Sequence, residues 1–250
     1  MCSWYAMPLC VHRMQKTRPT RLKPRLLHEM ELQPGSRSFA GAADLCEDPV
    51  VWMWQRKETC DESPEFDSWL ANDEKVRRDR LRRRPDRQRF AAGRAWLRVL
   101  LGEYLGLQPH QIVLQYGIHG KPCVEPGLQT PAVHFNVAHS GDVVLLAFHR
   151  SCEVGVDVEQ LTEKQDWDST ARLAFSSAQY ATWAASGTAE RQPAFFQHWT
   201  RREAGLKALG CGFAVEQPED WDSALTFIDL ELPAGYAGSV AILESSRISG

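Results

Sequence analysis

Two carboxylates lie two positions apart in the short segment Gly155-Val156-Asp157-Val158-Glu159. In a β-strand, residues i and i+2 point to the same face, so Asp157 and Glu159 would lie side by side while the two valines face a core. Close carboxylates repel unless a cation lies between them, and the pair therefore suits a hard divalent ion. The alternative interpretation is an ordinary strand whose acidic face meets solvent.

A third carboxylate lies one helical turn before a lysine. Glu203 and Lys207 are four residues apart, which places them on one face of a predicted helix. The same helix is rich in Phe, Trp and Leu, so it should pack against a core, and its acid could line a cleft. If Glu203 faces Asp157 and Glu159, three oxygen ligands and an ammonium meet there. The alternative is an exposed ion pair with a small effect on stability.

A third motif, Phe135–Gly141, is a predicted strand that ends in His139-Ser140-Gly141. It would place an imidazole, a hydroxyl and a free backbone N–H at one turn, a combination that suits a phosphate group. The segment Gly120-Lys121-Pro122 offers a further cation held by a rigid turn. Surface turns with an exposed histidine or lysine are the alternatives.

Charge is distributed unevenly along the chain. The net charge is −3, yet residues 71–94 hold ten Lys and Arg against four Asp and Glu. A basic segment in a weakly acidic chain indicates a local anion site rather than attraction of the whole protein to nucleic acid. The sequence contains neither a Walker-type glycine-rich loop nor G-x-S-x-G, which excludes a P-loop enzyme and gives no sign of a serine hydrolase.

Composition indicates a globular protein. The 250 residues are 43% hydrophobic and 24% charged, which excludes wholesale disorder. The longest clean apolar run, Val143–Phe148, is far shorter than the roughly 20 residues of a membrane helix, so no membrane span is predicted. Seven scattered cysteines without C-x-x-C spacing argue against a disulfide framework or a zinc site. Together with the lack of a signal-peptide pattern, they predict a cytoplasmic protein.

The elements that must position these residues follow from periodicity and turn signals. Residues 1–48 lack periodicity and contain four prolines, so we predict a poorly ordered N-terminal extension; a true translation start further on, for example at Met30, is an alternative. Strands are predicted over 50–54, 112–115, 134–138, 143–148, 154–158, 224–230 and 239–243, and helices from 72 or 73, from 86 to about 106, from 176 and from 193. Pro85 should interrupt the first of these helices, and Pro193 should lie in the first turn of the last.

This order predicts an α+β protein made of two similar halves. Residues 49–150 would form the N-terminal half, and residues 151–250 the C-terminal half with the candidate metal ligands. The three strands between 134 and 158 are expected to form an antiparallel meander, because tight-turn residues separate them.

The motifs in their order and spacing resemble the Sfp-type 4′-phosphopantetheinyl transferases. F-N-x-x-H-S-G at 135–141, G-x-D-x-E at 155–159 and W-T-x-x-E-A-x-x-K-A-x-G at 199–210 carry the resemblance, with Gly120-Lys121-Pro122 before them. The resemblance covers about residues 49–245. It implies a pseudo-dimer of two α+β halves with the active site between them, and a monomer in solution.

The resemblance also implies a reaction. Such an enzyme moves 4′-phosphopantetheine from coenzyme A to a serine of an apo acyl carrier protein or peptidyl carrier domain, and releases 3′,5′-ADP. Carriers of fatty-acid, polyketide and nonribosomal-peptide synthesis are all open. By motif position, Asp157, Glu159 and Glu203 would hold Mg²⁺, with Mn²⁺ as an alternative because both ions accept oxygen ligands. Glu203 or a metal-bound water would take the serine proton, and Lys207 would neutralise phosphate charge.

Coenzyme A would be bound by basic and motif residues from both halves. The resemblance assigns this role to Arg89, Lys121, Pro122, His139, Ser140, Lys207, Lys75 and Arg78. An acidic surface on the carrier protein would suit either the basic 75–94 segment or Arg201 and Arg202.

Two other functions compete with this interpretation. A nucleic-acid-binding module could use the basic segments, but residues 71–89 contain no aromatic side chain and no reader motif. We therefore expect no nucleic-acid partner. A Mg²⁺-dependent nucleotide hydrolase could use the same three carboxylates.

Overall fold

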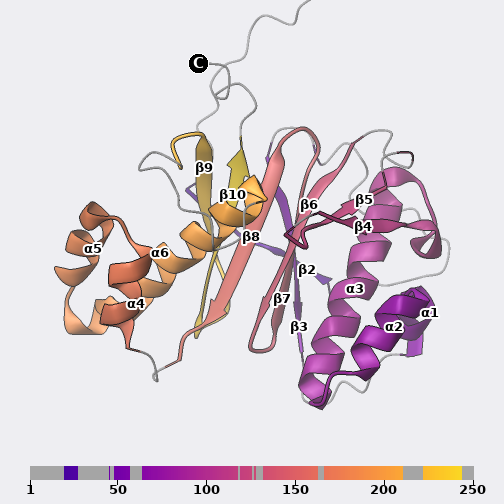
Figure 1. The fold of residues 1–250 in the computed structure, drawn as a ribbon, viewed down its shortest axis with the longest axis horizontal. Coiled ribbons are helices and arrows are strands. Elements are labelled where there is room, and N and C mark those ends of the chain that lie inside the picture. The colour runs from indigo at the N-terminus through magenta and orange to yellow at the C-terminus, as the bar shows by residue number, and fades with distance from the viewer. Residues whose placement is uncertain are drawn as a thin grey trace, which may run out of the picture.

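The computed structural model describes residues 20–27, 45, 48–56, 64–117, 119–125, 127, 132–162, 166–210 and 222–243. These residues form two four-stranded sheets, ordered β1-β9-β10-β8 and β2-β3-β7-β6, and a small β4-β5 hairpin (Figure 1). The elements are β1 (Arg21–Leu22), β2 (Arg25–Leu26), β3 (Val50–Gln55), α1 (Pro64–Trp69), α2 (Asn72–Asp79), α3 (Arg84–Leu105), η3 (Pro109–Gln111), β4 (Leu114–Tyr116), β5 (Pro122–Val124), β6 (His134–Ser140), β7 (Val143–His149), β8 (Glu153–Gln160), α4 (Trp167–Ala174), α5 (Ser177–Ala184), α6 (Thr188–Leu209), β9 (Leu225–Leu230) and β10 (Tyr236–Leu243). No helix among the described residues is long and apolar enough to cross a membrane.

Each sheet is accompanied by one helix of 22 residues, which gives the predicted pair of α+β halves. In the N-terminal half α3 packs on β7, and in the C-terminal half α6 packs on β8 and β10. The helix predicted to end near Gly106 does so, because Gly106 has φ 69° and its N–H returns to the carbonyl of Gly102. Pro85 lies in the first turn of α3, where its missing N–H costs little, and α2 ends before it at Asp79.

Strand β7 lies between the two main cores and is buried along its whole length. Its even-numbered residues, such as Val144 and Leu146, pack in a cluster with α3. Its odd-numbered residues, such as Leu145, pack in a second cluster with Val156 and Val240 of the other sheet. Because one face meets a helix and the other meets a sheet, the strand appears in the sequence as a continuous apolar run.

The predicted meander is wrong at its third strand. Strands β6 and β7 pair antiparallel, but β8 pairs with β10 in the other sheet. The turn after β7 closes on a side chain, since Nδ1 of His149 accepts hydrogen bonds from the N–H groups of Ser151 and Cys152 at 3.1 and 3.0 Å. The chain thus passes from the first sheet to the second, and β7 and β8 do not form a hydrogen-bonded hairpin.

Helix α6 also starts earlier than predicted. It begins at Thr188, with Pro193 inside the helix rather than in its first turn. The carbonyl of Gly187 accepts from the N–H groups of Glu190 and Arg191, so the first turn is complete before the proline is reached.

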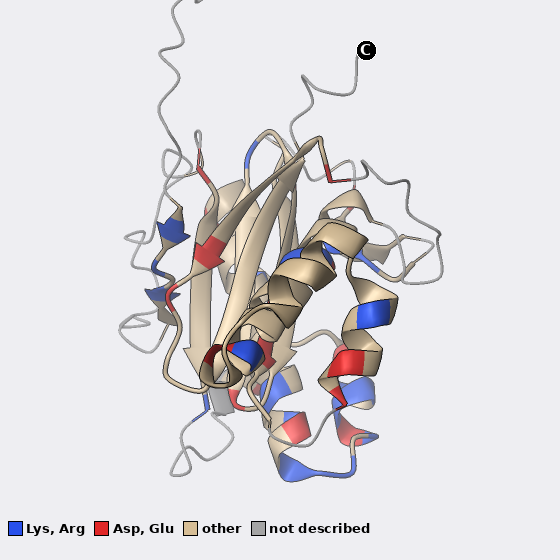
Figure 2. Ribbon diagram, turned by 90° about the vertical axis from the view of Figure 1, so that its left-hand side faces the viewer, with Lys and Arg blue, Asp and Glu red and all other residues tan. Residues whose placement is uncertain are grey.

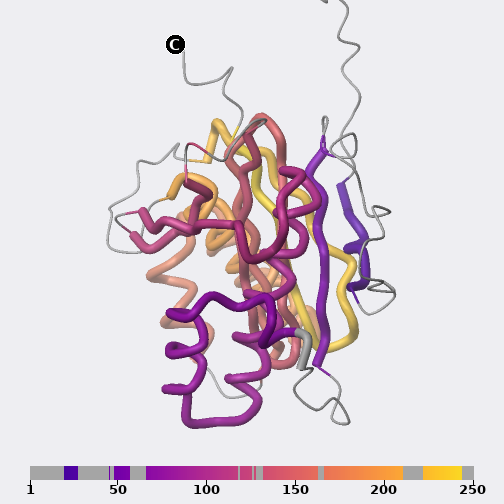
Figure 3. Tube along the Cα trace, turned by 90° about the vertical axis from the view of Figure 1, so that its right-hand side faces the viewer, coloured from indigo at the N-terminus to yellow at the C-terminus, as the bar shows by residue number. Residues whose placement is uncertain are grey.

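The prediction that residues 1–48 lie outside the fold is wrong for residues 20–27 and 45. Strand β1 pairs parallel with β9, and β2 pairs parallel with β3, so one short segment adds an edge strand to both sheets (Figure 3). Leu27 and Leu45 are fully buried. Strands of two residues are too short to show a period, so no pattern in the sequence marks β1 and β2 as strands. Most other residues of 1–48 lie outside the described residues.

We therefore expect residues 20–27 to contribute to stability. A protein lacking residues 1–28 should have a Tm lower by about 4 °C or more than one lacking residues 1–19, because burial of one leucine side chain stabilises by roughly 1.5–3 kcal/mol. The measurement is thermal unfolding of the two truncated proteins. Equal Tm values would show that the two edge strands add nothing.

Candidate functional site

The two sheets meet where β6 and β8 run side by side, and we call this line the seam. Backbone ladders do not span the seam among the described residues; side chains do. Oδ1 of Asn136 accepts from the N–H of Val156 at 3.0 Å. Oγ of Ser140 donates to Oε2 of Glu159 at 2.8 Å and accepts from the N–H of Gln160 at 3.1 Å. The predicted phosphate-binding and metal-binding motifs are thereby brought together.

Helix α6 lies so close to β8 that only glycine fits at position 155. A Cβ there would overlap the backbone of Ala204 and Ala208. This close approach places Lys207 against the strand, with its Nζ 2.6 Å from Oδ1 of Asp157. Asp157 and Glu203 are both buried, at 4% and 5% exposure. The glycine of G-x-D-x-E is therefore what lets the helix motif meet the strand motif.

The two buried carboxylates have raised pKa values. Burial is the main cause for both: it raises the pKa of Asp157 to about 6 against the opposing effect of Lys207. Burial and then the nearby charge of Asp157 raise the pKa of Glu203 to about 7. Oδ2 of Asp157 and Oε1 of Glu203 are buried without a hydrogen-bond partner. These two buried oxygens without partners indicate that the site can accept positive charge beyond that of Lys207.

Two of the three predicted carboxylate ligands, Asp157 and Glu203, are placed to bind a divalent cation, and the third, Glu159, is not. Among the residues that the structure describes, no three acidic, His or Cys side chains are grouped closely enough to form a ready metal site. Glu159, the third predicted ligand, is engaged with Ser140 across the seam. The two partnerless oxygens are what a hard cation would satisfy, and Glu159 would complete the set by turning from Ser140.

His139 lies at the end of β6 with two cations near it. The residue is exposed overall. Partial burial of its imidazole, followed by the positive charges of Arg89 and Lys207, lowers its pKa. Two cations, from α3 and α6, thus lie near an imidazole at the end of β6, an arrangement that suits a phosphate group.

The turn after His139 is held from both halves of the molecule. Gly141 has φ 52°, and its carbonyl accepts a hydrogen bond from Arg89, which also pairs with Asp86. From the other half, the hydroxyl of Tyr236 accepts from the N–H of Asp142 at 2.9 Å. Tyr236 was not predicted from the sequence, since a tyrosine in a strand far along the chain carries no motif.

Lys121 and Pro122 line a separate pocket of about 630 Å³ near the C-terminal end of α6. Residues of both halves form this Lys121 pocket, among them His134, Glu153 and Leu209. Neither His134 nor Glu153 belongs to a motif, so their place at this pocket was not predicted from the sequence.

Lys75 and Arg78 have partners within their own helical region. Lys75 lies 3.7 Å from Oδ2 of Asp67, and Arg78 pairs with Asp67 and Asp79. These partners belong to α1 and α2, not to the seam. The structure therefore gives no support for bringing Lys75 and Arg78 together with the other predicted coenzyme A ligands.

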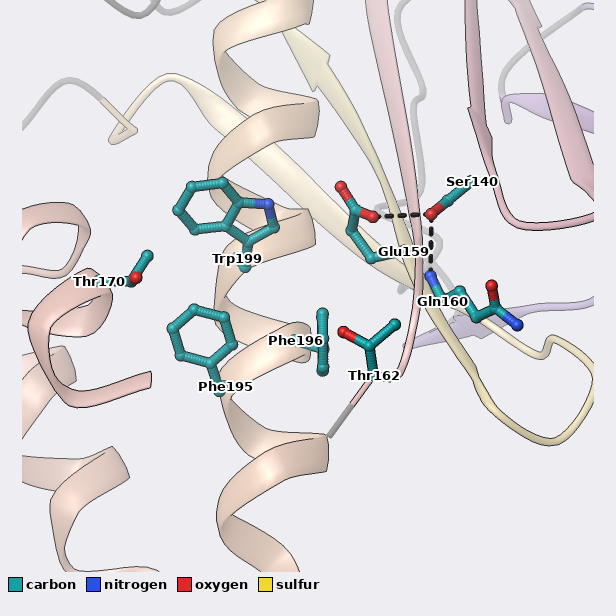
Figure 4. A pocket seen from close by; sticks show the side chains of 8 residues that line it. All are labelled: Ser140, Glu159, Gln160, Thr162, Thr170, Phe195, Phe196 and Trp199. Atoms are coloured by element: carbon teal, nitrogen blue, oxygen red, sulfur yellow. Dashed lines mark hydrogen bonds between the residues drawn. The ribbon is translucent and has the colours of Figure 1, made fainter. Parts of the chain in front are cut away.

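A smaller pocket of about 200 Å³ lies between Glu159 and the aromatic side chains of α6 (Figure 4). Glu159 and Ser140 form one wall of this Trp199 pocket, and Phe195, Phe196 and Trp199 of α6 form another. The rings of Phe195 and Trp199 stack at 6.0 Å with an interplanar angle of 16°. The pocket thus combines an apolar wall with a carboxylate and hydroxyl groups.

Comparison with known proteins finds the same family in both halves. Residues 153–244 match the 4′-phosphopantetheinyl transferase superfamily, and residues 57–151 match the N-terminal part of 4′-phosphopantetheinyl transferases. The chain is 36% identical over 157 residues to the 4′-phosphopantetheinyl transferase HetI of Nostoc sp., covering 63% of this chain and 65% of that relative. It is 35% identical over 126 residues to AcpT of Escherichia coli, which is 50% of this chain and 60% of AcpT.

A third relative is matched over more of its length. The 4′-phosphopantetheinyl transferase psf-1 of Bacillus pumilus is 32% identical over 173 residues, which is 66% of this chain and 71% of psf-1. The resemblance seen in the three motifs is thus confirmed by matches that extend over both halves, and the chain belongs to the 4′-phosphopantetheinyl transferase superfamily.

Proposed function

We propose that this protein transfers 4′-phosphopantetheine from coenzyme A to a serine of an apo carrier protein, with Mg²⁺ as the metal. The observation that supports it most is the meeting of Asp157, Glu203, Lys207 and His139 at the seam. Buried carboxylate oxygens without a partner lie there near the Lys207 ammonium and the His139 imidazole. A metal pyrophosphate meets both needs at once.

In the proposed reaction, the serine oxygen of the carrier forms a bond to the phosphorus next to pantetheine. The bond from that phosphorus to the bridging oxygen of the pyrophosphate breaks, and 3′,5′-ADP leaves with the electron pair. Asp157, Glu203 and a reoriented Glu159 would hold Mg²⁺, which when bound neutralises the pyrophosphate oxygens. Lys207 and His139 would stabilise charge that grows on the leaving group.

The serine must lose a proton during attack. A carboxylate oxygen at the site is the kind of group that can accept this proton, and Oε1 of Glu203 has no hydrogen-bond partner in the protein. We therefore assign this step to Glu203, with a water molecule at the site as the alternative acceptor. The Trp199 pocket adjoins Glu159 and would accept the pantetheine arm, whose methyl groups and amides suit its mixed walls.

The function is tested by intact-mass analysis of apo carrier proteins after incubation with coenzyme A and Mg²⁺. A mass increase equal to one phosphopantetheine group on the carrier serine is expected, together with release of 3′,5′-ADP. Release of 3′,5′-ADP without any carrier would instead favour a nucleotide hydrolase. No change in mass across fatty-acid, polyketide and nonribosomal-peptide carriers would contradict the proposal.

The carrier protein would dock on the α2–α3 turn. Arg201 is held by Asp229 through two hydrogen bonds of 2.8 and 2.7 Å, so its charge is already neutralised. Arg80, Arg82 and Arg83 are exposed on the turn, and basic residues gather at this lower end of the molecule (Figure 2). The turn directly precedes α3, whose Arg89 contacts the turn after His139. An acidic surface of the carrier protein would therefore contact the α2–α3 turn close to the seam.

Arg82→Glu should raise KM for the carrier protein several-fold and leave KM for coenzyme A unchanged. The matched control is Lys23→Glu, which makes the same change in net charge at the exposed β1–β2 connection on the outer edge of the sheets. Steady-state kinetics at low ionic strength, where surface charge acts most strongly, makes the comparison. Equal carrier KM values in the two variants would place the docking surface elsewhere.

A further inference from the structure

The ammonium of Lys121 is already fully used within the protein. It donates to Oε2 of Glu153 at 2.7 Å, to the carbonyl of Val154 at 3.2 Å and to the carbonyl of Ala208 at 3.4 Å. A lysine ammonium has three N–H donors, and three acceptors account for all of them. A phosphate could be bound by Lys121 only if one of these bonds were broken.

Glu153, in the C-terminal half, binds two side chains of the N-terminal half, Lys121 and His134. Its Oε1 lies 2.9 Å from Nδ1 of His134 on β6, while its Oε2 takes the bond from Lys121. These two hydrogen bonds, first that of His134 and then that of Lys121, lower the pKa of Glu153 to about 2. Glu153 itself starts β8 in the other half. One carboxylate therefore joins the hairpin region before β5, the start of β6 and the start of β8.

All of these groups border the Lys121 pocket. Its walls come from both halves, so its shape depends on how the halves are held at this end of the seam. An unpaired carboxylate would also repel an anionic ligand, and pairing with Lys121 removes that repulsion. The alkyl stem of Lys121 and the ring of Pro122 remain as apolar surface for a ligand.

We propose that Glu153 is a positioning residue that holds the Lys121 pocket in shape through Lys121 and His134, and that Lys121 joins the halves and does not bind phosphate. The inference rests on the proposed function, since the ligand is taken to be the nucleotide end of coenzyme A. The 3′-phosphate would then be met by another cation, such as Arg89.

The test measures binding of two probes, 3′,5′-ADP and 5′-AMP, to the full chain by calorimetry. Lys121→Met and Glu153→Gln should each weaken binding of both probes by the same factor, about tenfold. The double variant should be no weaker than either single variant, because both remove one shared interaction. KM for coenzyme A should rise by a similar factor with kcat within about twofold. Glu125→Gln is the matched control, since Glu125 is bonded to Gln115 within the β4–β5 region alone.

The outcomes separate the inference from the proposed function. A loss confined to 3′,5′-ADP in Lys121→Met would show that Lys121 binds the 3′-phosphate and would overturn the inference. Unchanged binding in both single variants would overturn it too, with the function intact. A wild-type protein that binds neither probe would overturn both. If Lys121→Met does not fold, Glu153→Gln alone decides, because a residue without a positioning role would leave the affinity of both probes unchanged.

Discussion

Asp157→Asn is expected to lower kcat/KM at least a hundredfold, and Asp157→Ala slightly more. The side chain is buried, its Oδ1 pairs with Lys207, and its Oδ2 has no partner in the protein. Asparagine keeps the shape but removes the charge that a divalent cation needs, and it leaves the Lys207 ammonium without its counter-ion. The measurement is kcat/KM for transfer to an apo carrier over a range of Mg²⁺ concentrations.

The control for this variant is Asp168→Asn, the same change at an exposed position on α4 where the acid pairs with Arg172. Its kcat/KM should stay within about twofold of wild type. If Asp157→Ala kept more than about a tenth of the wild-type kcat/KM, a loss under ~1.4 kcal/mol, Asp157 could not be a direct metal ligand.

The elements of the fold were largely predictable because their signals are local. The apolar run at 143–148 predicts β7, and Gly106 predicts the end of α3, as the structure shows. Which sheet a strand joins is not a local property. Strand β8 has turn residues before it, as a hairpin would, yet it pairs with β10, which lies far along the chain beyond α6.

The candidate site was predictable as a set of motifs and not as an arrangement. Spacing of two residues predicts that Asp157 and Glu159 share a face of β8, but it cannot show that α6 buries Asp157 and leaves Glu159 to Ser140. Tyr236 and Glu153 were missed for a related reason. Each acts through partners about 20 to 94 residues away, and a single sequence does not record such contacts.

Glu203→Gln is expected to abolish transfer and at the same time stabilise the metal-free protein. The carboxylate is buried beside Asp157 with Oε1 unpartnered, so its ionised form costs free energy in the folded state. Its pKa is raised from 4.5 to about 7. The folded protein therefore binds a proton that the unfolded chain does not bind between pH 4.5 and 7, and stability falls as pH rises through this window.

The stability gain of Glu203→Gln should accordingly be largest above pH 7 and should disappear near pH 4.5. A gain of about 1–3 kcal/mol at pH 8 is expected, measured as Tm or denaturant midpoint in the presence of a chelator. Glu190→Gln, on the exposed first turn of the same helix, is the control and should show no gain.

The two effects of Glu203→Gln have opposite signs, and this distinguishes a functional acid from a structural one. Replacing a carboxylate that stabilises the fold would lower the stability of the protein. Replacing one that is kept for its charge at a functional site would raise it. Mg²⁺ should reduce the difference in Tm between the two proteins, because it should raise the Tm of wild type more than that of the variant. The cation supplies the positive charge that the Glu203 carboxylate lacks in the metal-free protein. A Glu203→Gln protein that is less stable than wild type at pH 8 without metal would show that the acid is satisfied by the protein itself. The buried site would then have no need of a cation.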